Sequence, residues 1–128
     1  MSYHISRTIK GDFDDTIDRV KDALKTEGFG VLTEIDVKQT LKAKLDKDFR
    51  PYRILGACNP KLAFQALSLE DKIGVMLPCN VIVQQHADGT IEVSTVDPAT
   101  AMQAVGNMDL AGVATQVRAA LARIVAAL

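Results

Sequence analysis

Residues 73–98 read IGVMLPCNVIVQQHADGTIEVSTVDP and contain two apolar segments on either side of Ala87-Asp88-Gly89. In the first segment every odd position from Ile73 to Val83 is apolar, which predicts a strand over Ile73–Gln85. A two-residue turn would set apolar residues of the second segment opposite polar ones. A three-residue loop that ends at Gly89 with a bulge instead sets Val93 opposite Val83 and Thr95 opposite Val81. The pattern therefore predicts an antiparallel hairpin that ends at Asp97-Pro98.

Helix and strand patterns alternate before this hairpin, and one long helical pattern follows it. Strands are expected near residues 3–9, 29–37 and 52–57. Helices are expected from Asp12, a predicted N-cap, to Gly28, over residues 37–45, from the Asn59-Pro60 cap through Leu69, and over 108–128. The order β-α-β-α-β-α-β-β-α predicts an α+β fold, a mostly antiparallel sheet with helices on one face.

The composition fits a single soluble domain over residues 1–128. The chain is 48% hydrophobic and carries a formal charge of −1, which excludes intrinsic disorder and gives no overall attraction to nucleic acid. The first residues lack the apolar region of a secretory signal, and no stretch approaches about 18 uninterrupted apolar residues. With only two cysteines, the chain is expected to be cytoplasmic and reduced, with no membrane partner.

Two Cys-Asn pairs, each beside a proline, are the candidates for ligand binding: Cys58, Asn59, Cys79 and Asn80. Cys58 precedes a predicted helix N-terminus, which favours a thiolate; the alternatives are a small apolar filler and a metal ligand. Cys79 shares the parity of the core residues, where a thiol is inert, although Pro78 implies an edge or a bulge. The sharper hypothesis is that the two segments meet across neighbouring strands and form one paired-thiol site.

Other catalytic and metal sites are not indicated. His86 is about 23 Å along an extended strand from Cys79 and on its opposite face, which excludes a dyad within the strand. The cysteines and histidines lack zinc-finger spacing, so no metal is expected. Asp36 and Asp97 each end a predicted strand, where turn formation is their commoner role. The sequence names no cofactor.

Residues 38–53 carry a local charge of +4 on this nearly neutral chain. The cations offered for anion binding are Lys38, Lys42, Arg50 and Arg53. The alternative is a solvated helix face, with Val37, Leu41 and Leu45 on the buried side. Nucleic acid is disfavoured, because few phosphate contacts without interleaved aromatics bind weakly.

Three motifs resemble the domain-of-unknown-function 302 family: EGFGVLTEID at 27–36, YRILGACNP at 52–60 and LPCNV at 77–81. The resemblance covers roughly residues 13–98 and leaves the segment after Pro98 outside. It implies an α+β fold similar to that of the TATA-binding protein, and a homodimer. It implies no particular activity, because the family has none that is settled.

The alanine-rich helix over 108–128 bears on assembly. One apolar stripe is expected to cover the sheet, and a second, weakly polar face is left to pack on a partner subunit. The sequence thus favours a homodimeric small-ligand or thiol-redox binding protein that uses the two Cys-Asn motifs. The alternative is a non-catalytic module that binds an anionic ligand through residues 38–53.

Overall fold

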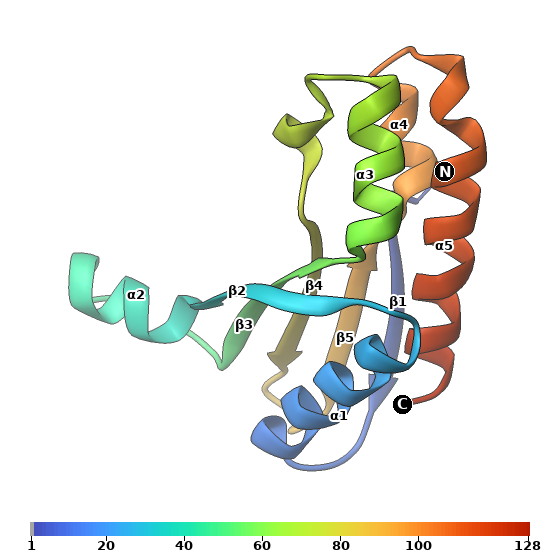
Figure 1. Cartoon of the computed structure of the whole chain (residues 1–128). Helices are drawn as coiled ribbons and strands as arrows, with labels where there is room; N and C mark the ends of the chain where they lie inside the picture. The colour runs from blue at the N-terminus through green and yellow to red at the C-terminus, as the bar shows by residue number, and fades with distance from the viewer. Residues whose placement is uncertain (1) are drawn as a thin grey trace.

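The computed structural model describes residues 2–128, which form a five-stranded antiparallel sheet with helices (Figure 1). The strands are β1 (His4–Ile9), β2 (Gly30–Asp36), β3 (Tyr52–Cys58), β4 (Cys79–Gln85) and β5 (Ile91–Val96). They lie in the order β1-β5-β4-β3-β2, and every neighbouring pair is antiparallel. The predicted α+β class with an antiparallel sheet is confirmed.

The hairpin of β4 and β5 has the register that its apolar positions require. Val83 pairs with Val93 and Val81 with Thr95, as predicted. The His86 N–H donates to the Thr90 carbonyl, and the Gly89 N–H donates to the His86 carbonyl, both at 2.9 Å. Gly89 takes a φ of 87°, the left-handed conformation of the predicted bulged three-residue loop.

The helices are α1 (Phe13–Thr26), α2 (Val37–Leu45), α3 (Pro60–Leu69), α4 (Pro98–Gln103) and α5 (Ala111–Ala126). Two short 3₁₀ turns, η1 (Ile73–Met76) and η2 (Met108–Leu110), join them to their neighbours. Asp12, Asp36, Asn59 and Asp97 cap α1, α2, α3 and α4. No helix within residues 2–128 is long and apolar enough to cross a membrane.

The core lies between one face of the sheet and helices α1 and α5. Its fully buried members include Leu24 from α1, Leu55 and Val83 from the sheet, and Leu121 from α5. A second, smaller cluster joins Ala66, Ile73 and Leu110 beside α3 and α4. The predicted C-terminal helix therefore covers the sheet.

The predicted start of the fourth strand at Ile73 is wrong, because the strand begins at Cys79. The backbone N–H groups of Ile73, Val75 and Leu77 donate to carbonyls three residues back, at 3.1–3.2 Å, so the chain coils here. Ile73 enters the second cluster, while Val75 is 85% exposed. Pro78 has no N–H to offer to a strand ladder. The apolar odd positions in this stretch therefore do not share one face.

The predicted burial of one face of α2 is also wrong. No residue of α2 is buried, and Leu45 is 63% exposed. The helix follows β2 directly and stands off from the rest of the molecule (Figure 1). Its apolar spacing identifies an apolar face, but the described chain covers that face only in part, with Val37 and Leu41 half-buried.

Candidate functional site

Cys58 and Asn59 lie where β3 runs directly into α3. The Asn59 Oδ1 accepts from the Leu62 N–H at 3.2 Å, and Pro60 occupies the first turn, so the predicted cap is confirmed. The Asn59 Nδ2 also donates to the Glu27 carbonyl at 3.2 Å. Asn59 thus ties α3 to the turn that follows α1, and both ends of its amide are engaged.

The second Cys-Asn pair starts β4 directly beside the first. Ala57 pairs with Cys79 and Gly56 with Asn80, so the two segments meet across neighbouring strands, as hypothesised. The two asparagines lie in different surroundings. Asn80 is exposed and has the opposite strand parity from Cys79, while both ends of the Asn59 amide are hydrogen-bonded to backbone groups. A role for either asparagine in holding a ligand stays a prediction.

Gly56 explains why three separate segments come together here. A β-carbon on Gly56 would overlap the Oγ1 of Thr33 and lie 2.9 Å from the Cγ of Pro78. Thr33 belongs to the segment 27–36 and Pro78 to the segment 77–81, so both pack directly on the backbone of the segment 52–60. Only a glycine permits this approach.

Both cysteines line one apolar cavity of about 40 Å³, enclosed between the ends of β3 and β4 and the helices α3, α4 and α5. Its wall includes Phe29, Leu62, Met102 and Val117. One water needs roughly 10–15 Å³ measured in this way, so the space holds only a few non-hydrogen atoms. Apart from the thiols and Asn59, the side chains of its wall are apolar.

The Cys79 thiol is held in its neutral form. Burial, with a further contribution from Cys58, raises its pKa to about 11. Cys79 therefore keeps its proton at neutral pH, which agrees with the expectation of an inert thiol. The contribution from Cys58 also places the two cysteines within electrostatic reach of each other.

Of the four cations suggested for anion binding, two are already paired with carboxylates of the chain. Arg53 is paired with Glu34 and Asp36, and Lys42 with Asp46 and Asp48. The pKa of Glu34 is lowered, first by the hydrogen bond from Lys21 and also by Arg53. The Arg50 guanidinium lies 4.4 Å from the centroid of the Phe49 ring. Lys38 stays exposed on α2.

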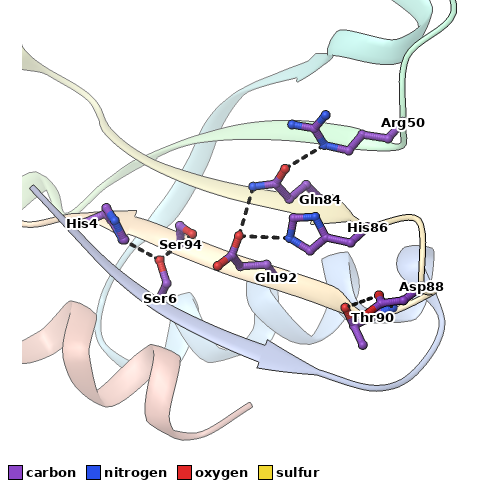
Figure 2. Close-up of polar contacts among 9 residues, drawn as sticks. All are labelled: His4, Ser6, Arg50, Gln84, His86, Asp88, Thr90, Glu92 and Ser94. Atoms are coloured by element: carbon purple, nitrogen blue, oxygen red, sulfur yellow. Dashed lines mark hydrogen bonds and ion pairs between the residues drawn. The ribbon is translucent and has the colours of Figure 1, made fainter.

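Polar side chains join in two networks on the sheet face opposite α1 and α5 (Figure 2). In the first network, Gln84 accepts from the Arg50 Nε at 2.8 Å and donates to Glu92 at 3.2 Å, and Glu92 also contacts His86 at 3.2 Å. In the second, the Ser6 hydroxyl lies 2.7 Å from His4 and donates to Ser94 at 2.7 Å. Apart from Arg50, a candidate for anion binding, the sequence predicts no functional role for these residues. Their even positions, alternating with the core residues, carry the signal for this face.

Within residues 2–128, no group of three or more histidine, cysteine, aspartate or glutamate side chains is placed to hold a metal ion. Asp36 and Asp97 act as helix caps, accepting from the N–H groups of Gln39 at 2.9 Å and Ala99 at 3.0 Å. Asp97 also pairs with Arg118 at 3.0 Å.

The family described as "Domain of unknown function DUF302" matches residues 5–128. The chain belongs to this family. The match extends beyond residues 13–98, which carry the motif resemblance, and includes α4 and α5. No curated protein matches the chain. The likeness of the DUF302 fold to the TATA-binding protein stays a prediction.

A solved DUF302 structure has closely similar geometry. It is the crystal structure of an uncharacterized conserved DUF302 protein from Bacillus stearothermophilus, 30% identical to this chain. The match covers 98% of each chain, with a TM-score of 0.92. DUF302 membership accounts for the fold and assigns no activity.

Proposed function

We propose that this protein is a homodimeric binding protein that holds a small, soft or electrophilic ligand at the thiols of the cavity. The observation that carries the proposal is the convergence of Cys58 and Cys79, 21 residues apart in sequence, on one apolar cavity. Thiol sulfur binds soft and electrophilic centres in preference to hard ions. The size of the cavity limits the ligand to a few non-hydrogen atoms.

The two thiols have different roles in this proposal. Cys58 is half-buried and lies immediately before the capped N-terminus of α3, whereas Cys79 is the thiol that burial holds in its neutral form. Cys58 therefore makes the bond to the ligand. Cys79 keeps its proton and supplies a neutral, polarisable wall beside it. Both thiols stay free in a reducing compartment such as the cytoplasm, where we place the protein.

Alkylation of the native protein with iodoacetamide, followed by mass spectrometry across pH 6–11, tests the thiol roles. Cys58 is expected to react in the folded protein near neutral pH. Cys79 is expected to stay unmodified there, with a rate that is still rising toward pH 11, because only its thiolate reacts. The variants C58S and C79S show which cysteine is alkylated, because each leaves only one thiol. Two cysteines that react only after denaturation would contradict the proposed thiol site.

Native mass spectrometry of the freshly purified protein tests ligand retention. A bound mass that is present in the wild type and in N80A, but lost in C58S, supports a ligand at the Cys58 thiol. N80A is the matched control because Asn80 belongs to the other Cys-Asn pair and is exposed. A bound mass retained in C58S would place the ligand elsewhere.

The alternative function, anion binding through residues 38–53, is less well supported. Arg53 and Lys42 are neutralised by carboxylates within the chain. The exposed lysines Lys38, Lys44 and Lys47 join none of the ion pairs found within residues 2–128. These lysines have another explanation, given next.

A further inference from the structure

Helix α2 lacks the packing that stabilises a helix of its length. It has nine residues, none of them buried. Isolated helices shorter than about 12–15 residues are marginal in water, and most helices in proteins are stabilised by a buried apolar face. Leu45 on α2 and Ile35 near the end of β2 are 63% and 47% exposed. The arm formed by β2 and α2 therefore presents an apolar surface that the described chain leaves open.

Helix α2, which carries part of this apolar surface, is positively charged: it holds Lys38, Lys42 and Lys44 and no carboxylate, and of the three only Lys42 is paired in the described chain, with Asp46 and Asp48. Residues 38–53 carry +4 and the whole chain carries −1, so all the other residues together carry −5. Lys38 and Lys44 extend from α2 into solvent and join none of the ion pairs seen in residues 2–128. Apolar area bordered by charge is the usual composition of a protein interface.

The complementary charge lies on α1. Asp14, Asp18 and Asp22 are spaced four residues apart, so they form a stripe on the exposed side of the helix. Like charges at this spacing repel each other, and the helix dipole offsets the repulsion only in the first turn. Asp18 and Asp22 lie beyond the first turn, and neither joins an ion pair in the part of the chain that the structure describes.

We propose that a second copy of this chain covers α2, with the α2 lysines on the α1 aspartates of that copy and the reverse contact made by two-fold symmetry. Each chain carries both the basic arm and the acidic stripe, so a symmetric dimer forms the contact twice. The apolar side chains of the arm are covered in the same step. Of the proposed function, this inference uses only the homodimer and is independent of the thiols.

A charge exchange between two variants tests the pairing by sedimentation velocity. K38E/K44E and D18K/D22K are each expected to be monomeric, with a dimer dissociation constant raised about tenfold or more, because each homodimer sets like charges together. An equimolar mixture is expected to form heterodimers, because both contacts in the heterodimer are then complementary. The wild-type dimer is expected to weaken between 0.05 and 0.5 M salt.

K61E/K72E is the matched control, because it makes the same change of charge at two exposed lysines away from the arm. It is expected to dimerise like the wild type. Circular dichroism of each variant checks that it is folded, and recovery in the mixture excludes misfolding as the cause of a monomer.

Three results overturn the inference. A dimer that resists every charge variant uses another surface, such as the exposed side of α5, and leaves the proposed homodimer intact. A monomeric wild type removes the homodimer as well and leaves the thiol site to its own test. Binding of inorganic polyphosphate to a monomeric wild type, lost in K38E/K44E, would assign the lysines to an anionic ligand.

Discussion

Gly56 sets the distance between β2, β3 and the approach to β4. With no side chain on Gly56, Thr33 and Pro78 both rest on its backbone, and this contact brings Cys58 and Cys79 to the same cavity. The packing at Gly56 thus explains why the three motif segments lie together in the fold. The cavity depends on this glycine although Gly56 does not line it.

We expect G56A to destabilise the protein by about 1–3 kcal/mol, because the added methyl group overlaps Thr33 and crowds Pro78. Urea denaturation measures the loss. G30A is the matched control in β2, since a β-carbon there meets no atom within 4 Å, and its effect should stay within about 0.5 kcal/mol. T33A removes the overlapping hydroxyl and should recover part of the loss in G56A/T33A. Equal stability of G56A and the wild type would refute this account of the contact.

At the scale of elements, the local sequence predicts helix caps and the register of the hairpin. Asn59-Pro60 predicts the start of α3, and the apolar register predicts the β4–β5 pairing, because each depends on residues that are close in the sequence. Helix α4 went unpredicted although Asp97-Pro98 repeats the Asn59-Pro60 signal, since the signal was read only as the end of a strand. Ile73–Leu77 was assigned wrongly because a short apolar run fits a strand or a coiled turn equally well.

We expect N59A to lose about 1–2 kcal/mol of stability, because it removes both the cap of α3 and the bond to the Glu27 carbonyl. N59D keeps an oxygen for the Leu62 N–H and places negative charge at the helix start, so its loss should be smaller. Guanidinium denaturation compares the two. A loss in N59D as large as that in N59A would show that the cap is not the main contribution.

At the scale of the whole molecule, prediction is poorest for the elements whose packing neighbours are distant in the sequence. Amphipathic spacing identified the apolar side of α2, yet no spacing reveals whether another part of the chain reaches it. The cavity is also beyond local patterns, because its wall combines residues from Phe29 to Val117. The sequence points to Cys58 and Cys79 of this wall but not to Met102, because α4 is missing from the prediction.

Hydrogen exchange rates of the backbone amides should differ between the sheet and α2. Amides of β3, β4 and β5, which lie within the sheet and beside the core, are expected to be the slowest to exchange. Amides of α2 should be among the fastest in dilute protein and slow several-fold as concentration rises and the proposed dimer forms. Protection of α2 that is the same at all concentrations would contradict this expectation.

The pairing of β1 has a consequence for synthesis. β1 is an edge strand whose neighbour in the sheet is β5, with Ile9 opposite Ile91 and His4 opposite Val96. Arg7 of β1 also donates to the carbonyls of Val125 and Ala126 at the end of α5, at 3.3 and 2.7 Å. On the ribosome, β1 is made before the other strands of this sheet and must wait, unpaired, until the chain has grown past position 96. The first strand of the sheet in chain order can therefore pair only with the last.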